Sequence, residues 1–279
     1  DGLPTVTSPE GESSGPVNVA VGPWGKVTVL IGGGPRDLDP RFATVQGAQG
    51  TTLADIAAYQ ATDPDPTDTE GIPGDSNPYG ITTLGRGRLL VADAGNNDLL
   101  LIGRDGSIQT VARIPPRMVS TAHVGDPNLP PMLPAEAVPT SVTVGPDGYW
   151  YVGELTGFPF TPGASRIWRI APWARNATCD EDTSDGCKLF ADGFTSITGL
   201  DAGKDGSLYV VEIVKTGVLG LFTGADTTGA LFRLKHGHRT EIAPGRFTAP
   251  ADVAVGDDGI LYVTNRSVMP DGEVLSIRR

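Results

Sequence analysis

The 279-residue sequence has no apolar stretch of about 18 residues, the length that a membrane-spanning helix needs. Basic residues are in the minority, with 21 Lys and Arg against 33 Asp and Glu, and they form no polybasic run. The resulting net charge of −12 repels phosphate backbones and gives no means of attachment to anionic lipid. The sequence therefore predicts neither a nucleic-acid partner nor a membrane association.

Signatures of catalysis are also scarce. There is no G-x-S-x-G nucleophile elbow and no phosphate-binding loop, and the GGG run at 32–34 lacks the helix pattern of a dinucleotide fingerprint. Of the three histidines, His236 and His238 flank a glycine in an expected outer turn. His123 lies in a long proline-rich insertion, 115–137, and is the one histidine placed to act as a general base. These absences favour a non-enzymatic protein.

The chain has only two cysteines, Cys179 and Cys187, which lie eight positions apart in CDEDTSDGC. Two thiols with no histidine nearby are too few for a structural zinc site. We predict a disulfide bond that closes a short acidic surface loop. A disulfide implies an oxidising, extracellular setting.

What the chain has in abundance is one repeated hairpin. Glycine and proline, 38 and 24 residues, make up more than a fifth of the chain, and the apolar residues alternate as in strands. A strand–turn–strand unit of thirteen residues occurs five times, with glycine at the seventh place and valine at the eleventh. The copies are Val19–Ile31, Ile81–Asp93, Val142–Glu154, Leu200–Glu212 and Val253–Asn265.

Each hairpin continues into further strands, which predicts repeated four-stranded antiparallel meanders. Repetition of this kind is typical of a β-propeller, in which sheets arranged radially protect their edges. A two-sheet sandwich is the alternative, although it has no reason to repeat one hairpin. We predict a single all-β propeller domain over 1–279, with blades at about 17–60, 77–114, 138–193, 196–246 and 249–279.

Several segments also carry a resemblance to a known family: NPYGI, LLVADAGNNDLL, VPTSVTVGPDGYWYVGELTGFPF, FTSITGL with LYVVE, and GEVLSIRR. In these segments the chain resembles the ScyD/ScyE family, which are NHL-like six-bladed propeller proteins typically exported by bacteria. The resemblance covers nearly the whole chain, and GELTGFPF and SNPYGI are its most specific parts. It implies a secreted bacterial protein, and the family supplies no established catalytic residues to carry across.

The beginning of the chain departs from that family. DGLP followed by PEGE resembles the end of a first blade, so residues 1–16 are either the end of a preceding blade or a closing strand. We expect a six-bladed arrangement whose first blade is missing from this sequence or is supplied by a second chain. The alternative is a closed five-bladed ring in which Leu3–Thr7 provides the fourth strand of the last blade.

Polar residues end four of the five repeats and are the main candidates for a site. If these strand ends converge on the central tunnel, their oxygen atoms could bind Ca²⁺. In related propeller hydrolases, calcium in this region polarises a lactone or ester and lowers the pKa of a bound water. Asp93, Glu154 and Glu212 are the predicted metal ligands. The full set of tunnel-face candidates is Asp93, Asn97, Glu154, Glu212 and Asn265.

The same residues have a structural alternative, because a polar strand end can equally accept hydrogen bonds from a loop backbone. Asn97 is alternatively a turn residue that tolerates a left-handed backbone. Phe158 and Phe160, in GFPF, could line a pocket for an apolar or aromatic ligand. Two functions stay open: a secreted non-enzymatic module that binds a protein or small molecule, and a calcium-dependent hydrolase or lactonase.

Overall fold

The computed structural model describes residues 2–8, 13–22, 25–47, 50–181 and 186–278 of the chain. Nearly all of its regular structure is antiparallel sheet. Within the described residues, the α-helices are the short α1 (Ile56–Gln60) and α2 (Val218–Phe222), and a 3-10 turn, η3, spans Gly85–Gly87. None of these helices is long and apolar enough to cross a membrane.

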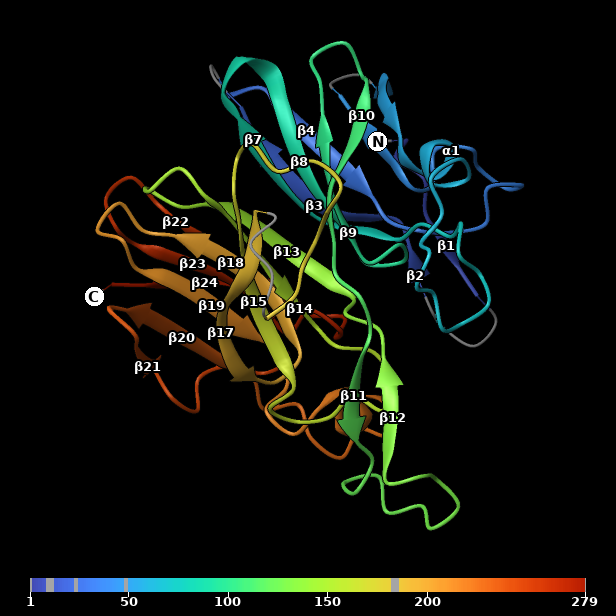
Figure 1. Cartoon of the computed structure of the whole chain (residues 1–279). Helices are drawn as coiled ribbons and strands as arrows, with labels where there is room; N and C mark the ends of the chain where they lie inside the picture. Colours follow the sequence, from blue (N-terminus) through green and yellow to red (C-terminus); the bar gives the residue numbers. More distant parts are fainter. Residues whose placement is uncertain (1, 9–12, 23–24, 48–49, 182–185, 279) are drawn as a thin grey trace.

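Five sheets follow one another along the chain as the blades of a five-bladed β-propeller (Figure 1). Blade 1 contains β3 (Pro16–Val21), β4 (Val27–Ile31), β5 (Thr44–Gln46) and β6 (Thr52–Asp55). Blade 2 contains β7 (Pro78–Leu84), β8 (Arg88–Asp93), β9 (Asp98–Ile102) and β10 (Ile108–Arg113). Blade 3 contains β13 (Pro139–Val144), β14 (Trp150–Glu154), β15 (Ser165–Ile170) and β17 (Cys187–Phe194). Blade 4 contains β18 (Ile197–Ala202), β19 (Leu208–Glu212), β20 (Ala230–Lys235) and β21 (His238–Ile242), and blade 5 contains β22 (Val253–Val255), β23 (Leu261–Asn265) and β24 (Glu273–Ile277).

The predicted hairpin repeat forms the first two strands of every blade. In the turns of blades 3, 4 and 5, Gly148, Gly206 and Gly259 have φ values of 79°. That left-handed backbone is one that glycine adopts without a steric cost. The shared turn explains why glycine recurs at the seventh place of the repeat.

The start of the chain does not supply the closing strand that the five-bladed alternative assigned to Leu3–Thr7. This segment contains β1 (Val6–Thr7), which pairs with β2 (Ser13–Ser14) and not with β24. Local pairing closes a much shorter loop than pairing with the far end of the chain, and therefore costs less entropy. Among the described residues blade 5 has three strands, and the chain forms a ring of five blades, the number that the hairpin repeat predicted.

Buried apolar side chains hold neighbouring blades together. Clusters of this kind lie between blades 1 and 2, 2 and 3, 3 and 4, and 4 and 5. Among the described residues no such cluster joins blade 5 to blade 1. A groove of about 500 Å³ lies there instead, lined in part by Val19, Tyr262 and Val274, which are 57%, 41% and 64% exposed. A side-chain hydrogen bond crosses this joint, from Asn18 Nδ2 to Asp252 Oδ2 at 3.3 Å.

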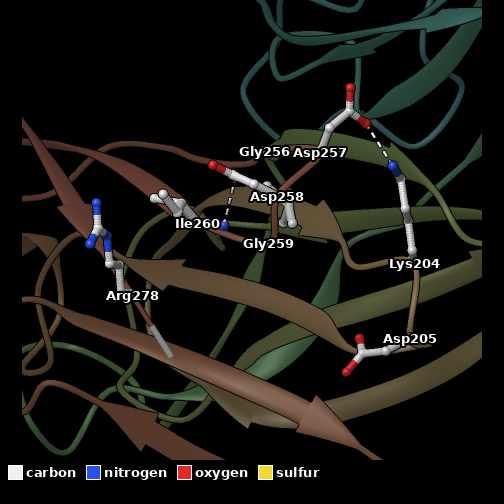
Figure 2. A pocket seen from close by; sticks show the side chains of 9 residues that line it. Lys204, Asp205, Gly256, Asp257, Asp258, Gly259, Ile260 and Arg278 are labelled. Atoms are coloured by element: carbon white, nitrogen blue, oxygen red, sulfur yellow. Dashed lines mark hydrogen bonds and ion pairs between the residues drawn. The ribbon is translucent and has the colours of Figure 1, made fainter.

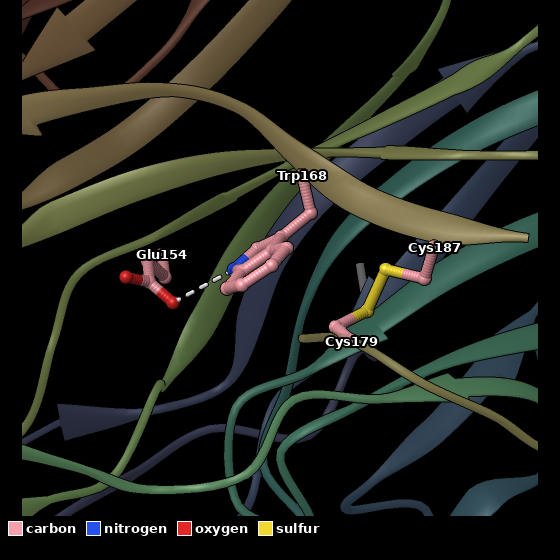
Figure 3. The surroundings of a disulfide bond; sticks show 4 residues. All are labelled: Glu154, Trp168, Cys179 and Cys187. Atoms are coloured by element: carbon pink, nitrogen blue, oxygen red, sulfur yellow. Dashed lines mark hydrogen bonds between the residues drawn. A yellow bond between two sulfur atoms is a disulfide. The ribbon is translucent and has the colours of Figure 1, made fainter. Parts of the chain in front are cut away.

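Two segments outside the five blades add further strands to the ring. The proline-rich insertion contains an antiparallel hairpin, β11 (Arg117–Ser120) and β12 (Met132–Ala135), which projects from the blades (Figure 1). The connection between β15 and β17 contains β16 (Ala177–Thr178), which pairs in parallel with β10 of blade 2. The predicted disulfide bond between Cys179 and Cys187 is confirmed and ties this connection back to β17 (Figure 3).

Candidate functional site

The polar residues that end the hairpin repeats are buried and bound to their own loops. Asp93 Oδ1, Glu212 Oε1 and Asn265 Oδ1 each accept a hydrogen bond from a backbone N–H just before the inner strand of the same blade. The donors, at 2.8 Å in every case, are Asn77, Thr195 and Thr248. In these three blades the polar strand end therefore accepts a hydrogen bond from the loop backbone, which is the structural role given as the alternative to a metal site.

Glu154 ends the hairpin of blade 3 and differs from the other three. It is fully buried and forms an ion pair with Arg117 from β11, so the inserted hairpin is anchored to the blade. Its Oε2 also accepts a hydrogen bond from Trp168 Nε1 at 3.1 Å, and Trp168 packs in the same apolar cluster as the disulfide (Figure 3). Burial raises the pKa of Glu154, while Arg117 lowers it.

The proposed calcium ligands Asp93, Glu154 and Glu212 lie in three different blades, each with its own hydrogen-bond partners. Across the described part of the chain, no group of three or more histidine, cysteine, aspartate or glutamate side chains is arranged to hold a metal ion. Asn97 is a left-handed turn residue, with φ at 53°. Its Oδ1 accepts the backbone N–H of Val138 at 2.9 Å, so it links blade 2 to the entry of blade 3.

The inner strands of all five blades meet around a small central pocket of about 190 Å³. Two acidic groups line it, Asp201 from β18 and Asp252 from the start of the blade 5 hairpin. Asp201 accepts hydrogen bonds from Thr143 Oγ1 at 3.0 Å and from the Val255 backbone N–H at 2.7 Å. Asp252 accepts a hydrogen bond from Asn18 of blade 1. Through these bonds Asp201 connects blade 4 to blades 3 and 5, and Asp252 connects blade 5 to blade 1.

Sequence reasoning missed this pair. Asp252 stands immediately before its repeat, where the other four copies have the small or neutral residues Asn18, Gly80, Ser141 and Gly199. An acidic residue that breaks such a pattern at an inner strand was the available signal. Burial raises the pKa of Asp252 to about 7, and it also raises the pKa of Asp201.

The raised carboxyl pKa values predict an unusual dependence of stability on pH. Burial raises the pKa of Glu212 to about 7 as well, against 4.5 for the ordinary side chain and 3.8 for an ordinary aspartate. The folded protein therefore binds more protons than the unfolded chain between about pH 4 and pH 7, so its stability falls as the pH rises through this window. We expect a lower thermal midpoint at pH 8 than at pH 5.

Two variants test the origin of this dependence. Asp252→Asn and Glu212→Gln each remove one of the groups that titrate in the window, so each should reduce the difference between the two midpoints. Asp205, whose pKa is lowered chiefly by Lys235, is ionised in both the folded and the unfolded chain above about pH 5, so it does not oppose the trend between pH 5 and pH 8. A wild-type midpoint that climbs steadily from pH 5 to pH 8 would contradict the prediction.

A wider hollow of about 640 Å³ lies between the turns of blades 4 and 5 (Figure 2). Its wall includes an ion pair between Lys204 Nζ and Asp257 Oδ1 at 2.7 Å, and both side chains are strongly exposed. Asp258 Oδ1 accepts the backbone N–H of Ile260 at 3.1 Å, as expected of a turn residue. The hollow is thus formed by solvated turn residues that already bind one another.

The predicted pocket residues Phe158 and Phe160 form part of a row of three aromatic rings, of which Phe160 is half-buried and the other two are exposed. The ring centres of Phe158 and Phe160 are 6.0 Å apart, and those of Phe160 and Phe222 are 5.8 Å apart, both edge to face. Phe158 is 46% exposed and Phe222 is 70% exposed. We call Phe158, Phe160 and Phe222 the phenylalanine row, which spans the loop that leaves β14 and the end of α2, the short helix that follows β19.

The inserted hairpin supports this row from one side. His123 Nε2 lies 2.8 Å from the Pro159 carbonyl oxygen, and Thr161 Oγ1 donates to the Ser120 carbonyl at 2.7 Å. His123 is therefore held against the loop of the phenylalanine row. His236 and His238 lie where β20 turns into β21, on the outside of blade 4.

Comparisons with known proteins agree with the architecture. The sequence matches no protein-family profile and no curated protein. Among solved structures, it is similar to a catalytically inactive histidine-to-alanine variant of virginiamycin B lyase from Staphylococcus aureus. The two are 15% identical, with a TM-score of 0.51, and the match covers 100% of this chain and 74% of that one. It is also similar to a protein of unknown function from Bacteroides caccae, with 13% identity, a TM-score of 0.51, and coverage of 94% and 78%.

A third similar structure is that of a nidogen/laminin complex, with 11% identity, a TM-score of 0.50, and coverage of 90% of this chain and 70% of that one. At such low identities these similarities establish the propeller fold alone, because one fold hosts many unrelated functions. The narrower resemblance to the ScyD/ScyE family is not confirmed by them.

Proposed function

We propose that the protein is a non-enzymatic propeller that works outside the cell and binds a partner through the phenylalanine row. The exposure of this row is the observation that carries the proposal. Large aromatic side chains are normally buried, and a group of exposed ones on a rigid scaffold is typical of a binding surface. Their two loops come from neighbouring blades, so the ring fixes their spacing before any partner arrives.

The positions of the histidines support a binding role over histidine-dependent catalysis. The similar virginiamycin B lyase structure is of a histidine-to-alanine variant that is catalytically inactive. In this chain the three histidines lie on the inserted hairpin and at an outer turn. None lines the described wall of the central pocket, where Asp201 and Asp252 are instead bound to neighbouring backbone and side chains. The disulfide bond supports an oxidising setting.

Replacement of the two most exposed rings tests the proposal. Phe158→Ser combined with Phe222→Ser should leave the fold intact, since both rings are exposed, one on a loop and the other at the end of the short helix α2. Arrays of peptides and of glycans are screened with the wild-type protein, and the strongest ligand is then titrated against the variant. We expect its affinity to fall at least about 10-fold, because aromatic anchors commonly dominate interface energies.

Trp173→Ser is the matched control. Trp173 is also strongly exposed, and its ring centre lies 5.7 Å from that of Tyr149, edge to face. It belongs to the connection that follows β15 in blade 3 and is not part of the phenylalanine row. Its loss should leave the affinity unchanged. Equal losses in both variants would contradict the proposed surface, and turnover in a screen of lactones and esters would contradict the non-enzymatic function.

A further inference from the structure

Two fully buried carboxylates face each other at the end of blade 2. Asp93 ends β8, Asp98 begins β9, and the two residues are directly paired across the strands. Between them lies the side-chain amide of Gln60, the last residue of α1. Gln60 Nε2 is 3.2 Å from Asp93 Oδ2, and 3.2 Å and 3.1 Å from the two oxygens of Asp98. Among the described residues, Gln60 is the one hydrogen-bond donor to the Asp98 carboxylate.

The equivalent positions of the other blades carry no such excess of negative charge. In blade 3 Glu154 is balanced by the guanidinium of Arg117. In blade 4 Glu212 is paired across the strands with Ala230. In blade 5 Asn265 Nδ2 donates to Glu273 Oε1 at 2.9 Å. Blade 2 is thus the place where two buried carboxylates share one neutral amide.

The surroundings supply only part of the missing positive charge. Arg113 is paired with Asp98 across β9 and β10, but its guanidinium forms an ion pair with Asp63 at 2.8 Å. Asp75 lies on the other side, where burial and the negative charge of Asp93 raise its pKa to about 7. Burial and the neighbouring Asp93 likewise raise the pKa of Asp98. Arg113 offsets part of the charge on Asp98, but Asp75, Asp93 and Asp98 together keep the local potential negative, which favours a cation.

The buried side-chain oxygen of Gln60, Oε1, has no hydrogen-bond partner within the described part of the chain. Asn96, in the four-residue loop that joins Asp93 to Asp98, also has an unpartnered buried oxygen, but its Nδ2 donates to the Pro73 and Asp75 carbonyls at 3.0 Å and 3.3 Å. A buried polar atom without a partner costs free energy, so it calls for an explanation. The nearby Asn97 shows the contrast: its Nδ2 also contacts two carboxylates, Asp65 and Glu136, but its Oδ1 is satisfied by the Val138 N–H.

We propose that Asp93, Asp98 and the side-chain oxygen of Gln60 bind one Ca²⁺ ion. A half-turn of the Gln60 amide exchanges its nitrogen and oxygen, and so brings an unsatisfied oxygen to both carboxylates. Two carboxylates and an amide oxygen are hard ligands of the kind that Ca²⁺ prefers, and water can complete its coordination. This site joins blades 1 and 2 and is separate from the phenylalanine row, so it can be tested without reference to partner binding.

The test uses the full chain after treatment with a chelator and dialysis. Calcium chloride is titrated in by calorimetry, and the thermal midpoint is measured with and without the ion. We expect one Ca²⁺ per chain and a midpoint that rises by about 5–10 °C when free Ca²⁺ exceeds the dissociation constant 100-fold. Asp98→Asn should abolish this rise, and in chelator it should have a higher midpoint than the wild type, because the repulsion between carboxylates is gone.

Two further variants make the result decisive. Gln60→Glu adds a third carboxylate, so it should bind Ca²⁺ at least about 10-fold more tightly and melt earlier in chelator. Glu212→Gln removes a buried carboxyl of blade 4 and should keep the full calcium response. The proposal is overturned if Ca²⁺ leaves the wild-type midpoint unchanged, or if Asp98→Asn responds to Ca²⁺ as the wild type does. A difference in pH dependence between the wild type and Asp98→Asn that is the same with and without Ca²⁺ would assign the pair a shared proton instead and would also overturn the proposal.

Discussion

Replacement of Arg117 by methionine is expected to lower the free energy of unfolding by about 3–5 kcal/mol, since removal of one partner leaves the other as an unpaired buried charge. Arg117 is paired with Glu154, which is fully buried. The guanidinium also donates to Thr156 Oγ1 at 3.0 Å and to the Ala164 carbonyl, so the change frees two further acceptors. Urea unfolding at pH 7 measures the loss.

A second substitution separates the charge effect from the loss of packing. Glu154→Gln in the Arg117→Met background removes the unpaired charge and keeps the shape, so it should recover most of the lost stability. The loss in the single variant should also be smaller at pH 5, because burial raises the pKa of Glu154 and the carboxyl can then take up a proton. A loss below about 1 kcal/mol at pH 7 would show that the pair is solvated and weak.

Removal of the disulfide bond should cost about 2–3 kcal/mol, the value expected when a short closed loop is released in the unfolded chain. The variant Cys179→Ala with Cys187→Ala tests this by thermal unfolding. Both cysteines are buried in the cluster between blades 2 and 3. Cys179 also donates its backbone N–H to the Arg113 carbonyl at 2.8 Å, next to the parallel pairing of β16 with β10. We therefore expect faster hydrogen exchange along the outer edge of blade 2.

Reductant provides the control for this experiment. It should lower the midpoint of the wild-type protein toward that of the double alanine variant and leave the variant unchanged. If the variant and the oxidised wild type melt within a degree of each other, the bond contributes nothing to folding and the stabilisation is due to the packing of β16 alone.

The hairpin repeat made the architecture accessible from the sequence. The repeat Val142–Glu154 predicted the strands β13 and β14 and the turn between them, because alternation and a turn glycine are local properties. The disulfide was accessible for the same reason, since two cysteines eight positions apart can close only a short loop. Phe158 and Phe160 were recognised as a pair, but Phe222 was not, because it comes from another blade.

The site residues show where such reasoning ends. Asp93 and Glu212 were placed on the tunnel face from their position at the end of the repeat. The repeat gives a residue's place within its hairpin, but it does not say which backbone N–H from the preceding loop will lie against it. The same limit applies to Gln60, because the pairing of Asp93 with Asp98 is local whereas the approach of α1 depends on how blades 1 and 2 pack.

The joint between blades 5 and 1 gives the ring a preferred place to open. The other four joints are filled with apolar side chains, whereas this one has a groove and the Asn18–Asp252 hydrogen bond. A joint held by one hydrogen bond should open locally at a lower free-energy cost than the four joints with apolar clusters. Asn18 and Asp252 also line the central pocket, so an opening at this joint would widen the pocket. Such an opening would give a small ligand access to the pocket from the side of the ring.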